Sequence, residues 1–504
     1  MTEHSENPHD YPLRKRIGLF LGLGLFIVIL ILPPAPGMSI EAKRTAGVAL
    51  LMAVWWLTEA ISISATALIP LAFFPLLGIN EAKQVAVSYG DTNIYLFLGG
   101  FLIAASMEKS KLHLRMAYSI VSVIGRNPRQ IILGFMCATG FLSMWISNTA
   151  TTLMMLPIGI ASIIALQKLD LSEDGGLKSF GAALMLGIAY SASIGGIATL
   201  IGTPPNIVFS SSAATLYPDR PAIEFLQWMI VALPVTIVLM FFTWILLTRI
   251  IYKIPGSRIA GIRESILLKK QELGRIRANE KKVLVVFICT ALGWIFRKDI
   301  FLGVVTIPGW GDLFPHPEYI NDATVAITSA LILFLIPEKN GSSEHLLNWK
   351  EAKKIPWGIL ILFGGGIALA SGFSSSGLSL WVGDNLKILE GMPILLIILV
   401  ITLLVTFLTE VTSNTATASL FMPLLGSLAV GINIHPYLLM LPAALSASCA
   451  FMLPVATPPN AIIFSSGRIS IFQMAKAGFI INIVGAMVIT LVVYYFAIPF
   501  LGLR

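Results

Sequence analysis

The chain has 504 residues, of which 56% are hydrophobic and 12% are charged, and its formal net charge is +8. Because soluble globular proteins carry roughly 25% charged residues, this composition argues against a soluble enzyme and predicts a protein that crosses a membrane many times. The basic residues cluster between apolar segments, which is typical of membrane topology rather than of nucleic-acid binding. The 3 cysteines lie in apolar segments without the spacing of a metal site or a disulfide framework.

Apolar stretches long enough to cross a hydrocarbon layer of about 30 Å recur from end to end. The first follows a polar tail that ends in Arg14, Lys15 and Arg16. No small-residue cleavage site follows it, so we expect a retained span rather than a signal peptide. We predict eleven transmembrane helices, at residues 17–33, 45–60, 62–79, 93–108, 180–213, 223–252, 283–296, 323–337, 356–373, 436–465 and 475–500.

Two further apolar stretches, 131–166 and 391–430, carry polar residues and prolines in their middles. Broken helices are tolerated at membrane depth only inside protein or beside a water cavity. We therefore predict that each stretch is a re-entrant hairpin, which enters and leaves the membrane from one side. The segment 109–129, before the first hairpin, fits an amphipathic helix at the membrane interface and fits an ordinary solvated loop equally well.

The distribution of basic residues sets the predicted orientation in the membrane. The segment 253–282 holds nine Lys or Arg and three Glu, and the segment 338–354 carries four Lys. With eleven spans, both segments fall on the same side as the N-terminal tail. We therefore expect a multi-pass protein of the cell membrane whose N-terminus is cytoplasmic and whose C-terminus is extracellular or periplasmic. The basic loop could also bind anionic lipid, although the topology rule alone accounts for it.

Several short motifs occur twice and in the same order. At an offset of 266 residues, Phe-Leu-Gly-Gly at 97–100 matches Phe-Gly-Gly-Gly at 363–366, Ser-Asn-Thr-Ala-Thr occurs at 147–151 and 413–417, and Met-Leu-Pro at 155–157 is echoed by Phe-Met-Pro at 421–423. Thr-Pro-Pro-Asn occurs at 203–206 and 457–460, an offset of 254, and the polar loop at 170–178 accounts for the difference. The copies begin in the fourth and ninth predicted spans, so five spans separate them and they run in opposite directions. This pattern predicts an inverted repeat with a binding site near the membrane midplane.

The two Ser-Asn-Thr motifs lie in the middles of the two predicted hairpins. Ser and Asn cap helices and stabilise turns, so such a tip ends one half-helix and begins another. It leaves free carbonyl groups, which suit a cation, and free amides, which suit a carboxylate. Thr-Pro-Pro-Asn breaks a span in a similar way, because two prolines remove two amide donors. The alternative, polar motifs that only pack or kink helices, is disfavoured by their duplication.

None of the four motifs contains an ionisable residue. A dicarboxylate that entered this neutral site would therefore bring uncompensated charge at a high desolvation cost. Bound cations would offset that charge, which predicts co-transport. Glu59 and Glu410 are acids near the membrane that could relay protons, but we expect both at helix ends. No metal-ligand spacing, nucleophile and base pair, or nucleotide loop indicates an enzyme.

The Ser-Asn-Thr and Thr-Pro-Pro-Asn motifs resemble those of the divalent anion/sodium symporter family, which includes sodium-dependent dicarboxylate and citrate transporters. The resemblance covers nearly the whole chain. It implies an all-α polytopic membrane protein of about eleven transmembrane helices and two re-entrant hairpins. It also implies a homodimer in the lipid bilayer that works as an elevator, in which a transport part slides along a static scaffold.

On this basis we expect a cytoplasmic tail at 1–16, scaffold segments at 17–92 and 283–355, and a basic cytoplasmic loop at 253–282. The expected transport segments are 93–252, with hairpin 131–166 and broken helix 180–213, and 356–504, with hairpin 391–430 and broken helix 436–465.

The resemblance also implies roles for individual residues. The substrate carboxylates would be held by Ser147, Asn148, Thr149, Thr203, Ser413, Asn414, Thr415, Thr457 and Pro458. A first sodium ion would be held by Ser143, Ser147, Asn148 and Gly202, and a second by Thr409, Thr412, Asn414 and Ala456.

The expected function is sodium-coupled import of a di- or tricarboxylate such as succinate, malate, fumarate or citrate. A sodium-independent carboxylate exchanger on the same fold is the main alternative, disfavoured because no Lys or Arg stands in the motifs to replace sodium. A transporter of sulfate or phosphate is a further alternative.

Overall fold

The computed structural model describes residues 12–125, 127–167, 176–255, 267–268, 270–301, 306–339, 343–385 and 391–503. These residues are mainly helical, and one small antiparallel sheet pairs β1 (Ile300–Phe301) with β2 (Thr306–Ile307). Most of the predicted tail at 1–16, and parts of the loops predicted at 170–178 and 253–282, lie outside the described residues.

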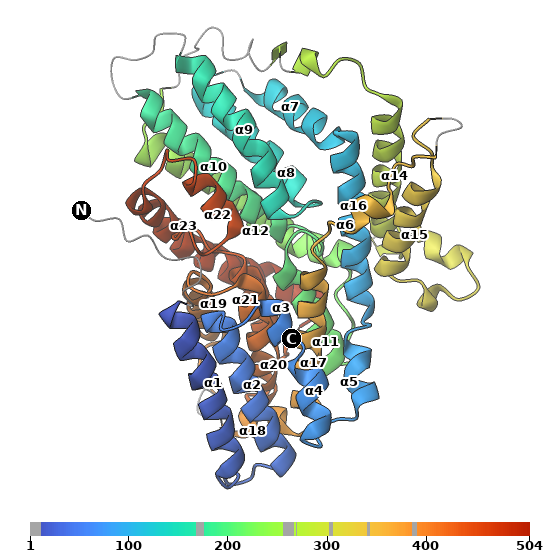
Figure 1. Cartoon of the computed structure of the whole chain (residues 1–504), viewed down its shortest axis with the longest axis vertical. Helices are drawn as coiled ribbons and strands as arrows, with labels where there is room; N and C mark the ends of the chain where they lie inside the picture. The colour runs from blue at the N-terminus through green and yellow to red at the C-terminus, as the bar shows by residue number, and fades with distance from the viewer. Residues whose placement is uncertain are drawn as a thin grey trace.

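The helices follow one another along the whole chain (Figure 1). Their bounds are α1 (Leu13–Ile31), α2 (Ile40–Thr58), α3 (Ile63–Thr66), α4 (Ile69–Leu76), α5 (Ala82–Ser88), α6 (Thr92–Ser110), α7 (Leu112–Ile124), α8 (Pro128–Ser143), α9 (Asn148–Gln167), α10 (Gly176–Ile197), α11 (Pro204–Leu216), α12 (Phe225–Ile245), η1 (Leu246–Ile251), α14 (Ala278–Ile295), η2 (Trp310–Leu313), η3 (Pro317–Tyr319), α15 (Asp322–Leu335), α16 (Trp349–Ala352), α17 (Trp357–Ser375), α18 (Leu378–Asn385), α19 (Ile394–Thr409), α20 (Asn414–Gly431), α21 (Tyr437–Ala447), α22 (Pro458–Phe464), α23 (Ile471–Val492), η5 (Val493–Ala497) and α24 (Ile498–Leu501).

Each predicted span coincides with helical structure, although several spans are interrupted. The span predicted at 62–79 consists of the short helices α3 and α4, and the broken spans are divided into α10 and α11 and into α21 and α22. Among the described residues, four helices are long and apolar enough to cross a membrane by length and composition alone: Gly176–Ile197, Phe225–Ile251, Trp357–Ser375 and Ile471–Leu501. The total of eleven spans therefore stays a prediction.

Both stretches predicted as hairpins are helical pairs. Residues 144–147 join α8 to α9, and residues 410–413 join α19 to α20. Asn127 begins the first pair, because its side chain accepts a hydrogen bond from the amide of Gln130 and Pro128 occupies the first helical position. The first hairpin lies in the upper half of Figure 1 and the second in the lower half. Their tips therefore approach the middle of the molecule from opposite ends.

The segment at 109–129 contains helix α7 rather than an irregular loop. The helix begins after Lys111, which adopts a left-handed conformation with φ of 64°. Arg115 ties the helix to the start of α14, because its Nε donates to Oε2 of the buried Glu280 at 2.7 Å. The helix α18 follows α17 in the same way that α7 follows α6.

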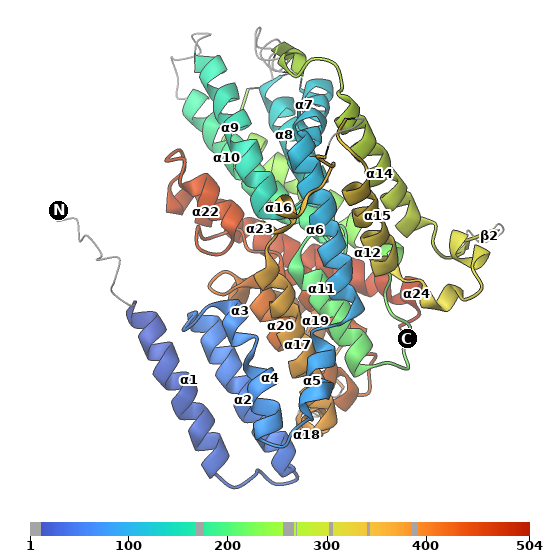
Figure 2. The same ribbon diagram turned by 45° about the vertical axis from the view of Figure 1, so that its right-hand side comes forward.

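The two copies of the repeat pack reciprocally. The second half of each broken helix contacts the hairpin of the other copy, α11 against α20 and α22 against α9. The repeated glycines sit where two helices touch, since a Cβ on Gly99 would meet Ala326 of α15 at 2.5 Å and one on Gly365 would meet Ala67 at 2.4 Å. Thus α6 packs on α15, and α17 packs on α3 and α4 (Figure 2). The reciprocal contacts of α11 with α20 and of α22 with α9 place each helix break beside the hairpin of the other copy.

Candidate substrate and cation site

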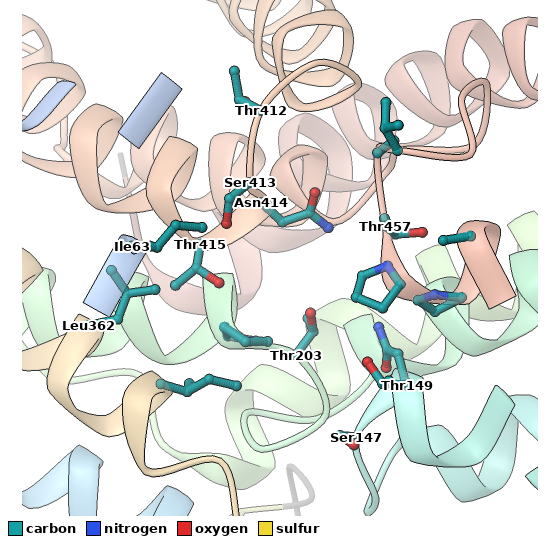
Figure 3. Close-up of a pocket in the computed structure, with 18 of the residues that line it drawn as sticks. Ile63, Ser147, Thr149, Thr203, Leu362, Thr412, Ser413, Asn414, Thr415 and Thr457 are labelled. Carbon is teal, nitrogen blue, oxygen red and sulfur yellow. The ribbon is translucent and has the colours of Figure 1, made fainter. Parts of the chain in front are cut away.

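A cavity of about 690 Å³ lies between the two hairpin tips and the two helix breaks. It is lined by all of the predicted site residues except Ser143 and Thr409, which lie behind the tips. Figure 3 shows the side chains of Ser147, Thr149, Thr203, Ser413, Asn414, Thr415 and Thr457 around it, whereas the side chain of Thr412 points away from the others. Motifs that are up to about 310 residues apart in sequence therefore share one site.

The first hairpin tip gathers several oxygen atoms around Asn148. One end of its side-chain amide lies 2.6 Å from Oγ of Ser143, 3.3 Å from the carbonyl oxygen of Gly202 and 3.1 Å from that of Ala192, and the amide nitrogen at this end donates to all three oxygens. Gly196 makes this approach possible, because a Cβ there would lie 2.6 Å from Asn148 Oδ1. A group of hydroxyl, amide and carbonyl oxygens without a fixed charge is the type of ligand set that a hard cation uses.

The second tip has a similar hydroxyl–amide contact at the equivalent positions 409 and 414, with a carbonyl oxygen that approaches the hydroxyl instead of the amide. Oγ1 of Thr409 lies 2.7 Å from Oδ1 of Asn414 and 2.9 Å from the carbonyl oxygen of Ala447. One hydroxyl proton cannot satisfy both acceptors, so this cluster also has more oxygen atoms than protons to share. The hydroxyl of Thr412 does not join it, because it bonds to the carbonyl oxygen of Leu408 and to Thr417 Oγ1.

The asparagine of each Thr-Pro-Pro-Asn motif donates hydrogen bonds to carbonyl groups at the helix break, on the side away from the cavity. Nδ2 of Asn206 lies 3.2 Å, 3.3 Å and 2.7 Å from the carbonyl oxygens of residues 196, 197 and 199. Nδ2 of Asn460 lies 3.1 Å and 3.0 Å from those of residues 450 and 453, which are equivalent positions. Both asparagines are completely buried. They therefore replace the lost helical hydrogen bonds of the break, whereas the cavity is lined by Thr203, Pro204, Thr457, Pro458 and Pro459.

Glu410 holds the second break against its hairpin. It ends α19, as the sequence predicts, and accepts hydrogen bonds from the amides of residues 451, 452 and 453 at 2.6, 2.9 and 3.1 Å and from Asn482 Nδ2 at 2.7 Å. In the first copy the equivalent residue is Met144, and Thr199 donates to its carbonyl oxygen instead. All four partners of Glu410 are donors, which gives it a positioning role. Sequence reasoning placed it at a helix end but gave no signal for these contacts.

Two charged residues, Arg14 and Glu59, lie on the cavity wall, where the sequence analysis had not placed them. Glu59 ends α2, as predicted, in a left-handed conformation with φ of 51°. Its Oε2 lies 3.5 Å from Nη2 of Arg14 and 3.8 Å from Nζ of Lys15. Arg14 and Glu59 both line the cavity. In the sequence, the basic triplet at 14–16 indicates only the orientation of the chain, because no pattern there shows that α1 begins beside the motifs.

Known proteins with similar sequences are sodium-dependent transporters by name. The sodium-dependent dicarboxylate transporter SdcS of Staphylococcus saprophyticus is 44% identical over 497 residues, which cover 98% of this chain and 93% of the relative. SdcS of Staphylococcus aureus strain MRSA252 is 44% identical over 503 residues, covering 99% and 94%.

Two solved structures share the fold at low sequence identity. They are the Alcanivorax borkumensis YdaH transporter, with a TM-score of 0.58, 13% identity and coverage of 96% and 99%, and Neisseria gonorrhoeae MtrF, described among antimetabolite efflux pumps, with a TM-score of 0.56, 12% identity and coverage of 97% of both chains. This likeness shows an all-helical membrane transporter fold. The sequence model described as "Sodium:sulfate symporter transmembrane region" matches residues 13–503. The chain therefore belongs to this family, the divalent anion/sodium symporters, as its duplicated motifs predicted.

Proposed function

We propose that this protein is a sodium-coupled symporter that imports a di- or tricarboxylate of the succinate, malate, fumarate or citrate class across the cell membrane. The observation that carries the proposal is the convergence of both motif pairs on one cavity whose motif residues carry no charge. The names of relatives that are 44% identical over nearly the whole chain support both the cation and the substrate class.

The proposed residue roles follow the two copies. Each Ser-Asn-Thr tip begins a helix, and each Thr-Pro-Pro-Asn motif begins another with Pro at its first two positions. Helix N-termini attract carboxylates, so the two ends of a dicarboxylate face one tip each. The substrate ligands are Ser147, Asn148, Thr149 and Thr203 from the first copy and Ser413, Asn414, Thr415, Thr457 and Pro458 from the second. Sulfate has a single charged centre, so it could not contact both facing tips at once as a dicarboxylate can. We therefore expect it to bind more weakly.

The proposed sodium sites lie behind the tips. The first comprises Ser143, Ser147, Asn148 and the carbonyl oxygen of Gly202. The second comprises Thr409, Asn414, the carbonyl oxygen of Ala456 and Thr412. Because the hydroxyl of Thr412 is engaged within the hairpin, its carbonyl oxygen is the atom we assign to the cation.

We propose that sodium binds before the substrate, because the amide of Asn148 can adopt two orientations. Turned one way, its oxygen faces the three other oxygens, an arrangement that a cation stabilises. When the amide is rotated by 180°, its nitrogen donates to the carbonyl oxygens of Gly202 and Ala192 and to Oγ of Ser143. The amide oxygen then points to the opposite side. Sodium at the oxygen cluster therefore leaves the amide nitrogen free to donate to a substrate carboxylate.

We further propose that the two copies form an inverted repeat and move as an elevator. In this scheme the transport segments are 93–252 and 356–504, and the scaffold segments, 17–92 and 283–355, form the homodimer. The boundary carries contacts that such a movement must break. Trp145 at the first tip stacks on Trp294 of α14 with ring centroids 6.3 Å apart, and Arg297 pairs with Glu224 at 2.9 Å.

The test is uptake of labelled succinate into proteoliposomes that contain no internal substrate. An inward sodium gradient should drive uptake, and the rate should rise steeply with sodium because two sites are proposed. Equal uptake in potassium or choline medium would contradict symport. A requirement for internal dicarboxylate would indicate the exchanger, and stronger competition by sulfate than by malate would indicate an inorganic-anion transporter.

A further inference from the structure

The wall of the substrate cavity carries a charged pair that the proposed mechanism does not use. Of the described residues that line the cavity, Arg14 and Glu59 are the charged ones. They belong to neighbouring helices, the start of α1 and the end of α2. Figure 2 shows that the start of α1 lies at the upper end of the lower half of the molecule, at about the level of α3.

A close helix contact fixes where this pair stands. Gly18 lies against Thr58, since a Cβ on the glycine would lie 1.9 Å from Thr58 Oγ1. Arg14 precedes Gly18 by four residues, so both lie on the same face of α1, and Glu59 directly follows Thr58. The contact therefore holds the guanidinium and the carboxylate at the edge of the cavity.

The pair is suited to exchange partners. The side chains of Arg14 and Glu59 are 56% and 45% exposed, and their closest atoms are 3.5 Å apart. Exposed pairs of this kind are worth about 0.2–1 kcal/mol, so a carboxylate that arrives from solution can displace Glu59. A guanidinium can bind such a carboxylate through two parallel hydrogen bonds.

We propose that Arg14 is a docking residue for the dicarboxylate at this mouth of the cavity, and that Glu59 competes with the substrate for its guanidinium. This inference rests on the proposed function and adds a residue outside the motifs that binds the substrate at one mouth of the cavity. The proposal also predicts that the pair acts on one side of the membrane. Arg14 lies at the N-terminal end of α1, which the predicted topology places toward the cytoplasm, so we expect it to act on substrate from that side, where an importer releases it.

The experiment compares succinate transport in right-side-out and inside-out membrane vesicles that contain the full chain. Arg14→Gln should raise KM for substrate on the N-terminal side by about two- to fivefold, the range of an exposed charge pair, and leave KM on the other side unchanged. Glu59→Gln should lower KM on the N-terminal side, because the competitor is removed. Arg14→Lys should fall between the wild type and Arg14→Gln. Arg16→Gln, an exposed residue of the same helix turn, is the matched control and should match the wild type.

The two substitutions predict opposite changes, which a merely structural pair would not give. A rise in KM with Glu59→Gln, or an equal change on both sides with Arg14→Gln, would overturn the proposal. If Arg14→Gln does not fold, the direction of change in Glu59→Gln still decides. Absence of sodium-driven transport in the wild type would instead refute the proposed function.

Discussion

The phenyl ring of Phe97 packs edge to face against that of Phe363, with ring centroids 5.1 Å apart and planes at 88°. The two residues occupy the same position in the two copies of the repeat, at the offset of 266. In the proposed inverted repeat, a residue that touches its own equivalent lies beside the local two-fold axis, as at an isologous interface. Phe97 also lines the cavity, together with residues of both copies of each motif, so the proposed axis would pass beside the site.

The amide of Asn148 gives a prediction about coupling. Asn148→Asp supplies acceptor oxygens at both ends, so sodium should still raise the melting temperature while succinate binding is lost. Asn148→Ala and Asn414→Ala should each nearly abolish transport, because a hydrogen bond to a charged group is worth about 1.5–3 kcal/mol. Thermal shift with each ligand and uptake assays measure these effects. Asn385→Asp, exposed on α18, is the control, and normal succinate binding by Asn148→Asp would refute the amide mechanism.

Residues 196 and 450 occupy equivalent positions in the two copies, but the first is glycine and the second is alanine. The next prediction concerns this difference. In Gly196→Ala the new Cβ would lie 2.6 Å from Asn148 Oδ1 and 3.0 Å from the carbonyl oxygen of Gly202. Overpacking costs about 1–3 kcal/mol, so the sodium concentration for half-maximal uptake should rise about tenfold. Ala450→Gly should change it little, since it adds no atom. Equal behaviour of the two variants would show that Gly196 does not shape the first cation site.

Glu410→Gln tests the clamp on the second break. The substitution places an amide group among four hydrogen-bond donors, and each bond to a charged group is worth about 1.5–3 kcal/mol. We expect a clear fall in melting temperature and in transport. Glu41→Gln, at an exposed position in the first turn of α2, should change neither. A melting temperature for Glu410→Gln equal to that of Glu41→Gln would mean that the carboxylate does not hold residues 451–453.

His435, in the segment between α20 and α21, predicts sensitivity to acid. Burial, and secondly the positive charge of Arg220, lower the pKa of His435 to about 4. In the unfolded chain its pKa is about 6.5, so the unfolded state binds more protons as pH falls from about 6.5 towards 4, and the folded state loses stability there. His435→Gln should therefore reduce the drop in melting temperature between pH 7.5 and pH 5. His316→Gln, at an exposed position, should leave the drop unchanged.

The proposed movement is tested by crosslinking on a background that lacks Cys137, Cys289 and Cys449. Cysteines at positions 145 and 294 replace the stacked tryptophans of the boundary. A short bifunctional thiol reagent should join them and stop transport. Cysteines at positions 129 and 244, whose residues are hydrogen-bonded within the transport part, should be joined without loss of transport. Full transport after crosslinking at 145 and 294 would refute the elevator and favour a local gate.

The duplicated motifs made the helical hairpins and the helix breaks predictable, because proline and asparagine act locally on the backbone. They also identified the family. The roles of Asn206 and Asn460 were not separable from those of their threonine and proline neighbours, since only the fold shows which side of the break each residue faces. The contacts of Arg14, Glu59 and Glu410 could not be predicted, because their partners are distant in sequence or are backbone atoms. Neither kind of partner leaves a pattern in the sequence.

The buried asparagines behind the two breaks have a further consequence. A broken helix in hydrocarbon needs hydrogen-bond partners for its carbonyl groups, and a loop in water obtains them from solvent. Here Asn206 and Asn460 take the place of that solvent and are fixed to the same segments as the carbonyl groups that they satisfy. The polar centre is thus solvated by its own chain, and a shift of the whole centre along the membrane normal would leave this internal solvation intact at every depth.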